Sequence, residues 1–261
     1  MKTPVAKFTG ERPGWGRDFD YDESRHLAAY AYAYGQADGR DVLDAGCGEG
    51  FGTHRMADVA RSVTGIDYSA DAVSACRDTW QRSNLSFRQV DLTAPGDFAE
   101  RFDLVLNFQV LEHIDEPLPF LLGLRDRLRP DGMLILTTPN RLRSFSENPY
   151  HVREYTAPEL KELLDGVFGR VDMHGMHGNE KVELFDVGRE RAVKRILRLD
   201  PLGLRNLLPS ALVNFAFARL ALVVRRSAKR SGTADAIVPE DFFVRAEDTD
   251  VALDLVALCR P

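Results

Sequence analysis

The segment VLDAGCGEGFG at residues 42–52 restricts the fold of this chain more than any other. A short apolar run ends in Asp44, and four glycines follow at alternate positions, namely Gly46, Gly48, Gly50 and Gly52. Glycine lets the backbone turn tightly and lie directly against a ligand, and the N-terminus of a following helix attracts negative charge. The segment therefore predicts a strand, a ligand-binding turn and a helix.

Strand-like and helix-like patterns alternate from this segment onward. The expected strands are 41–46, 62–67, 86–91, 102–107, 133–138, 170–175 and 250–259. The expected helices are 22–34, 52–60, 70–81, 117–128 and 158–164. Several strands are short, continuous apolar runs, which are typical of a parallel sheet covered on both faces. The pattern predicts an α/β fold with a Rossmann-like, doubly wound, seven-stranded sheet. The sheet should be mostly parallel, with strand 7 antiparallel and a helical insertion between strands 6 and 7.

The expected organisation has four parts. Residues 1–38 form an N-terminal arm and helix, 39–178 the core, 179–237 the helical insertion, and 238–261 the last strand, which completes the core. The formal net charge of −6 argues against a nucleic-acid partner. The three cysteines predict no disulfide framework, and the first residues contain no apolar signal segment, so we expect a cytoplasmic protein.

The glycine-rich turn has two interpretations. A dinucleotide fold requires GxGxxG, but Phe51 or Thr53 occupies the third glycine position, depending on where the count begins. This argues against an NAD-dependent oxidoreductase, which stays the less favoured alternative. The turn fits a nucleoside that carries an amino acid.

Polar residues also end three other expected strands, namely Asp67, Asp91 and Asn107. In open α/β sheets, ligands bind at the carboxyl edge of the strands. There, Asp67 could accept hydrogen bonds from both hydroxyls of a ribose, and Asp91 could accept one from an adenine amino group. These residues therefore extend the candidate site at the glycine-rich turn.

The chain resembles the class I S-adenosylmethionine-dependent methyltransferases, especially the branch of quinone-biosynthesis, small-molecule and sugar O-methyltransferases. The matching segments are LDAGCGEG, GIDYSADAV, VDL, FDLVLNFQVLEHI and LRPDGMLILTTPN. The resemblance implies S-adenosyl-L-methionine as cofactor, with its methionine end near Asp44, Gly46, Gly48 and Gly50. It implies Asp67 at the ribose, Tyr68 beside the adenine, Asp91 and Leu92 at the adenine edge, and Asn107 at the end of strand 4.

The expected reaction is O-methylation of a small or medium polar metabolite, such as a saccharide or glycolipid precursor. An oxygen acceptor gains from a general base with a pKa near neutrality, which favours histidine. His151, with Glu154 three residues later, is the first candidate. His113 follows strand 4 and could serve in catalysis or hold the loop.

Some relatives bind a divalent metal through ExxEH after strand 4. Here the segment reads QVLEH, so Gln109 replaces the first carboxylate. An amide is a poorer ligand for Mg²⁺ than a carboxylate, and we expect no metal.

The insertion should select the acceptor, a small molecule that is anionic or carries a sugar. Residues 210–230 contain an apolar stretch flanked by arginines and predict a lid helix. The alternatives are a homodimer contact and peripheral contact with an anionic membrane surface. A non-catalytic module that binds the cofactor is a further alternative for the whole chain.

Overall fold

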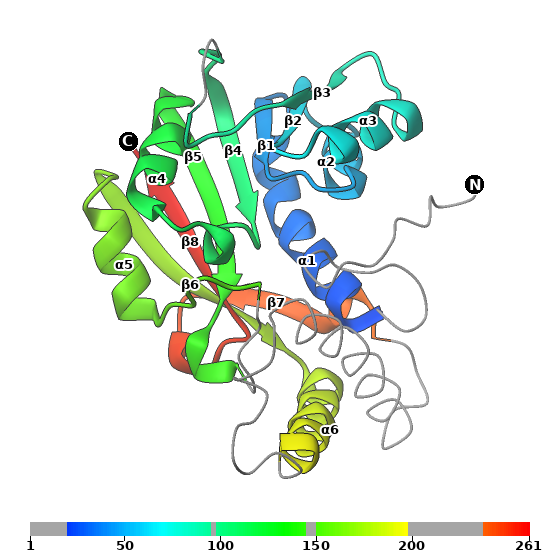
Figure 1. The fold of residues 1–261 in the computed structure, drawn as a ribbon, viewed down its shortest axis with the longest axis vertical. Coiled ribbons are helices and arrows are strands. Elements are labelled where there is room, and N and C mark those ends of the chain that lie inside the picture. Colours follow the sequence, from blue (N-terminus) through cyan, green and yellow to red (C-terminus); the bar gives the residue numbers. More distant parts are fainter. Residues whose placement is uncertain (1–19, 95–97, 145–149, 198–236) are drawn as a thin grey trace, which may run out of the picture. The chain divides into compact units, whose positions relative to one another are not determined.

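The computed structural model describes residues 20–94, 98–144, 150–197 and 237–261 (Figure 1). The chain divides into two compact units. The larger unit comprises residues 29–143, 152–177 and 244–261, and the smaller one comprises 1–28, 144–151 and 178–243. The expected insertion at 179–237, the predicted acceptor lid, is described only at 179–197 and 237, so its apolar stretch at 210–230 lies outside the described residues.

Strands and helices alternate along the chain as the sequence predicts. The strands are β1 (Asp41–Ala45), β2 (Ser62–Asp67), β3 (Leu85–Gln89), β4 (Phe102–Phe108), β5 (Leu128–Pro139), β6 (Arg170–Gly178), β7 (Phe242–Arg245) and β8 (Asp254–Arg260). The α-helices are α1 (Asp20–Ala37), α2 (Phe51–Met56), α3 (Ala70–Thr79), α4 (Pro117–Asp126), α5 (Ala157–Asp165) and α6 (Glu180–Leu197).

The strands form one mixed sheet in the order β3-β2-β1-β4-β5-β8-β6-β7. Neighbours from β3 to β5 are parallel, whereas β8 runs antiparallel to both β5 and β6. Strand β6 is therefore parallel to β5, and the prediction of a mostly parallel sheet with an antiparallel last strand is confirmed. The predicted number of seven strands is wrong. The additional strand, β7, has only four residues at the sheet edge, too few for a periodic signal.

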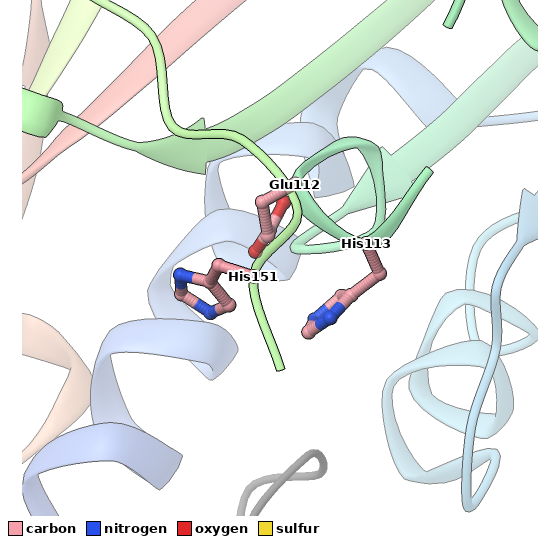
Figure 2. A group of neighbouring side chains, drawn as sticks. All are labelled: Glu112, His113 and His151. Carbon is pink, nitrogen blue, oxygen red and sulfur yellow. The ribbon is translucent and has the colours of Figure 1, made fainter. Parts of the chain in front are cut away.

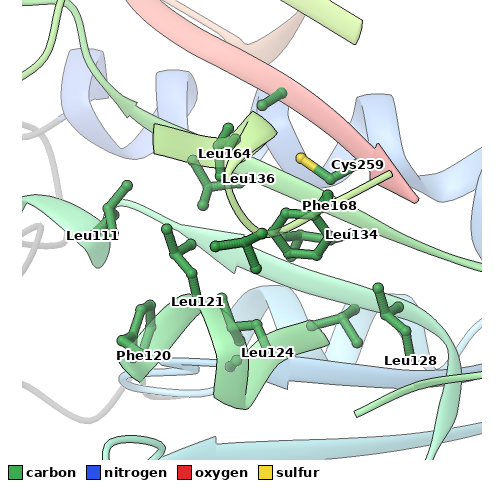
Figure 3. Close-up of a cluster of buried hydrophobic side chains, with 14 of the residues drawn as sticks. Leu111, Phe120, Leu121, Leu124, Leu128, Leu134, Leu136, Leu164, Phe168 and Cys259 are labelled. Carbon is green, nitrogen blue, oxygen red and sulfur yellow. The ribbon is translucent and has the colours of Figure 1, made fainter. Parts of the chain in front are cut away.

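Side chains from alternate positions of the central strands pack on opposite faces of the sheet. On one face, Leu43, Val105, Leu134 and Leu255 belong to a cluster that includes the apolar sides of α4 and α5 (Figures 1 and 3). The intervening residues are buried as well, among them Val42, Leu104, Ile135 and Val256. Because both faces of these strands are buried, apolar residues occupy consecutive positions in them, which explains the continuous hydrophobic runs in the sequence.

Several element boundaries differ from the sequence prediction. Helix α1 continues through Gly35, since glycine within a helix is unfavourable by only about 1 kcal/mol relative to alanine. Strand β5 begins at Leu128, although Pro130 and Gly132 predict a turn there. An irregularity in its pairing with β4, between Phe102 and Leu104, accommodates these residues. Strand β3 ends at Gln89, two residues earlier than predicted.

The smaller unit has its own aromatic cluster. The ring of Tyr21 stacks on Phe185 of α6 at 4.9 Å between centroids and meets the edge of Phe242. Asn179 caps α6 by accepting hydrogen bonds from the backbone amides of Lys181 and Val182. Among the described helices, none has the length and apolar character needed to cross a membrane.

Candidate active site

The parallel strands β1, β2 and β4 bring three predicted residues to one edge of the sheet. In the register, Asp44 lies opposite Gly65 of β2 on one side and opposite Leu106 of β4 on the other. Asp67 ends β2, and Asn107 is the penultimate residue of β4. All three side chains are at least nine-tenths buried. Polar groups with so little exposure need partners in the protein or in a ligand.

Three of the glycines in the glycine-rich turn have the left-handed backbone conformation, which glycine adopts without steric cost. The φ angles are 92° at Gly46, 52° at Gly48 and 75° at Gly50. The amides of Gly46 and Cys47 donate to the carbonyl oxygen of Ile66, at 2.8 and 2.9 Å, which fixes the turn to β2. A Cβ atom placed on Gly48 would meet no atom within 4 Å. The turn therefore leaves open space that a ligand can approach.

Asp67 supports this turn directly. One carboxylate oxygen accepts a hydrogen bond from the amide of Gly48 at 3.0 Å, and the other accepts one from the amide of Ser69 at 2.9 Å. Asp67 thus positions the turn through one oxygen and the start of the segment before α3 through the other.

Asp44 is held by two hydroxyl groups. Its Oδ2 atom accepts hydrogen bonds from Tyr30 Oη at 2.9 Å and from Thr53 Oγ1 at 2.6 Å. Its Oδ1 atom is buried and has no hydrogen-bond partner among the described residues. Burial raises the pKa of Asp44 to about 6, and the charge of Asp67 adds to this rise, whereas both hydroxyls oppose it. The free oxygen is suited to a cationic donor.

Asn107 lies beside this group at the end of β4. Its Nδ2 atom donates to the carbonyl oxygen of Ala45 at 2.8 Å. Its Oδ1 atom is buried without a partner among the described residues. Asn107 therefore ties β4 to the beginning of the glycine-rich turn and leaves a second buried acceptor at this edge.

The residues expected near an adenine occupy more exposed positions. Tyr68 has 64% of its side chain exposed, and Asp91 is exposed beyond the end of β3. Asp91 accepts hydrogen bonds from the amide and the hydroxyl of Thr93, which lower its pKa. Leu92 is buried and belongs to the cluster beneath α4. Asp91 therefore stabilises the turn that follows β3. Of these three residues, Leu92 is the one that belongs to the hydrophobic core.

The turn after β4 carries the sequence QVLEH. Gln109 has a φ angle of 56°, and its amide donates to the carbonyl oxygen of Thr137 at 2.9 Å. Glu112 is 1% exposed and accepts a hydrogen bond from Thr138 Oγ1 at 3.0 Å. His113 is half-buried at the end of the same turn, from which both side chains emerge in Figure 2.

The chain after residue 151 is attached to this turn. The amides of Val152 and Arg153 donate to the carbonyl oxygen of Glu112, at 2.7 and 3.2 Å. Val152 is bonded to His151, which Figure 2 also labels, and Glu154 follows two residues later. This backbone connection ties the segment that follows His151 to the carboxyl edge of the sheet.

Comparison with known proteins places the whole arrangement in a family. A family model described as a methyltransferase domain matches residues 36–184, which is more than half of the chain. The chain belongs to the class I S-adenosylmethionine-dependent methyltransferases. This methyltransferase is 37% identical over 196 residues to a protein of Mycolicibacterium smegmatis named as a probable S-adenosylmethionine-dependent methyltransferase. The match covers 67% of this chain and 75% of that relative.

Two further similarities are more limited. A ubiquinone biosynthesis O-methyltransferase of Actinobacillus pleuropneumoniae is 35% identical over 113 residues, covering 40% of the methyltransferase and 47% of the relative. The crystal structure of the [4+2]-cyclase SpnF has a TM-score of 0.58 at 19% identity, covering 91% of this chain and 81% of that one. The second similarity concerns the fold alone.

The donors and acceptors at the sheet edge fit S-adenosyl-L-methionine, the cofactor of this family. The two buried, unpartnered oxygens of Asp44 and Asn107 call for a hydrogen-bond donor, and the cofactor's methionine portion carries an ammonium group. The open space at Gly48 can admit the amino acid part of the cofactor. The sequence predicts Asp44 and Asn107 as site residues, but not Tyr30 and Thr53, the two hydrogen-bond partners of Asp44. A tyrosine in a preceding helix gives no signal of such a contact.

Two alanine substitutions in the glycine-rich segment should lower stability for different reasons, and the Gly48 substitution should also affect ligand binding. In Gly48→Ala, the new methyl group meets no atom of the described residues within 4 Å and occupies the open space that we assign to the ligand. We expect a folded protein with a strain of about 1–2 kcal/mol from the positive φ angle and strongly weakened binding of S-adenosylhomocysteine. In Gly52→Ala, the methyl group overlaps the ring of Tyr30, and we expect a loss of about 1–3 kcal/mol in stability.

Thermal melts and calorimetric titration of both variants check this prediction. A Gly48→Ala variant that binds S-adenosylhomocysteine with the affinity of the parent protein would contradict the assignment of this space to the cofactor. A Gly52→Ala variant that melts at the parent temperature would contradict the close packing of Tyr30.

Proposed function

We propose that this methyltransferase transfers a methyl group to a hydroxyl oxygen of a small or medium polar metabolite, such as a saccharide or glycolipid precursor, with His151 as the general base. The observation that carries the proposal is the pair of hydrogen bonds from Val152 and Arg153 to Glu112. These bonds hold Val152 and Arg153, the two residues that follow His151 in the sequence, at the turn after β4. The similarity to the ubiquinone O-methyltransferase also supports an oxygen acceptor.

The proposed cofactor contacts follow the strand ends. Asp44, Gly46, Gly48 and Gly50 would surround the methionine portion, with Asn107 beside it. Asp67 would accept hydrogen bonds from the ribose hydroxyls. Tyr68 would lie beside the adenine, with Asp91 and Leu92 at its edge. The burial of all three side chains supports the assignment of Asp44, Asp67 and Asn107. For Asp44 and Asn107 a ligand could also satisfy the Oδ1 atoms, which have no partner among the described residues.

The bound cofactor supplies an electrophilic methyl group on a sulfonium. The protein has to hold the acceptor oxygen in line with that group, and such positioning accounts for a large share of the rate enhancement. His151 would accept the hydroxyl proton as the oxygen–methyl bond forms. Glu154 would orient His151. His113 is the second candidate for the base, because its own turn follows β4 directly.

The insertion would determine which acceptor binds. Strand β6 is parallel to β5, so the chain leaves β6 at the carboxyl edge, where the proposed site lies. Helix α6 begins two residues after β6 ends. The proposed membrane contact and homodimer contact through residues 210–230 lie outside the described residues.

An acceptor panel tests the proposal. The purified protein is incubated with S-adenosylmethionine and free sugars, glycolipid precursors, phenols or amines, each with Mg²⁺ and with a chelator. We expect S-adenosylhomocysteine and a methyl ether in equal amounts with a hydroxyl acceptor, and background levels without an acceptor. Methylation of an amine nitrogen or a carbon would contradict the proposal. Cofactor binding without turnover over the whole panel would favour a non-catalytic module.

A further inference from the structure

We propose that Tyr30 and Thr53 are positioning residues, which hold one oxygen of the Asp44 carboxylate and direct the other toward the ammonium group of the cofactor. The inference rests on the proposed placement of the methionine portion beside Asp44. It goes beyond that placement because it assigns a role to α1, the helix before the glycine-rich segment. Tyr30 also precedes residue 36, where the match to the family model begins.

The geometry supports a clamp on one side of the carboxylate. Tyr30 comes from α1 and Thr53 from α2, and both donate to the same atom, Asp44 Oδ2. Two donors occupy the acceptor positions of that oxygen. All three residues are at least 96% buried, so water does not substitute for these hydroxyls. The remaining oxygen is the one left for a ligand.

Packing around Tyr30 fixes the clamp in place. The Tyr30 ring meets Phe108 of β4 edge to face, at 4.9 Å between centroids. Gly52 lies against the other part of the ring, where even a methyl group would not fit. The ring therefore has little freedom to rotate, and its hydroxyl is held toward Asp44. Such preorganisation reduces the entropy lost when a ligand binds.

Burial and a neighbouring charge should make the binding of an ammonium group to Asp44 depend on pH. Asp67 from β2 is the neighbouring carboxylate, and Tyr30 and Cys47 are the other titratable neighbours among the described residues. Burial and Asp67 raise the pKa of Asp44 to about 6, whereas the bonds from Tyr30 and Thr53 lower it. Below about pH 6 the free protein protonates Asp44, and a neutral carboxyl group pairs poorly with an ammonium group. Removal of either hydroxyl should move this transition to higher pH.

Calorimetric titration of two ligands tests the inference. S-adenosylhomocysteine carries the amino acid portion, whereas 5′-methylthioadenosine lacks it. In Tyr30→Phe and Thr53→Val, we expect the affinity for S-adenosylhomocysteine to fall by about 3–10-fold at pH 7, the range for one hydrogen bond. The loss of affinity on acidification should begin at higher pH than in the parent protein. The affinity for 5′-methylthioadenosine should stay unchanged.

Two control variants separate positioning from a structural effect. Thr53→Ser, unlike Thr53→Val, keeps the hydroxyl group, and it should keep both the affinity and the pH profile of the parent protein. Tyr32→Phe removes a hydroxyl from the same helix, and it should bind both ligands like the parent protein. Equal weakening of both ligands in Tyr30→Phe, or an unchanged pH profile, would overturn the inference. If the parent protein binds 5′-methylthioadenosine and S-adenosylhomocysteine equally well, the placement of the methionine portion itself is wrong.

Discussion

Replacing His151 with alanine is expected to lower kcat by about 10²–10⁴-fold, the usual contribution of a general base. The affinity for S-adenosylhomocysteine should remain unchanged, because the proposed cofactor contacts come from other residues. Some turnover should remain, since positioning of the two reactants persists without the base. Steady-state kinetics with a hydroxyl acceptor from the panel would measure kcat, and calorimetry would measure the cofactor affinity.

His54→Ala is the matched control for this experiment. His54 lies on α2, where its ring is 4.6 Å from that of Trp80 and its Nε2 atom accepts a hydrogen bond from Arg82. Its replacement should leave kcat close to that of the parent protein. An unchanged kcat in His151→Ala, together with a large loss in His113→Ala, would move the base to His113. Unchanged kcat in both variants would contradict histidine base catalysis.

Alanine at Asp67 is expected to weaken S-adenosylhomocysteine binding by at least about tenfold. Hydrogen bonds to a charged group contribute about 1.5–3 kcal/mol each, and the proposed ribose contact uses two of them. From the sequence alone, a strand-end carboxylate on a ligand cleft should contribute little to folding. The structure changes this expectation, because Asp67 is 7% exposed and accepts hydrogen bonds from the amides of Gly48 and Ser69. We therefore also expect a lower melting temperature.

Asp71→Asn provides the comparison for Asp67→Ala. Asp71 is exposed in the first turn of α3, so its replacement should change neither the melting temperature nor the affinity substantially. Titration calorimetry and thermal melts of the two variants separate the effects. A dissociation constant for S-adenosylhomocysteine that is unchanged in Asp67→Ala would exclude Asp67 from the cofactor site.

Local sequence patterns were sufficient to predict the central part of the fold. Continuous apolar runs and the helices between them indicated a doubly wound sheet, because both faces of such a sheet are buried. The pattern failed where an element was short or irregular. The four residues of β7 are too few to show periodicity. Strand β5 begins at Leu128, before Pro130 and Gly132, which in the sequence indicate a turn, because its irregular pairing with β4 accommodates both residues.

The sequence by itself determined the family and the residues at the strand ends, because Asp44, Asp67 and Asn107 each follow or end a recognisable apolar run. Parallel strands bring such residues to one edge whatever the details of packing. The tertiary structure alone decided which groups contact them. Tyr30 is 14 residues from Asp44, and its hydroxyl reaches Oδ2 only because α1 packs beside Gly52 and Phe108. That contact depends on side-chain packing between separate elements, for which a linear sequence carries no periodic signal.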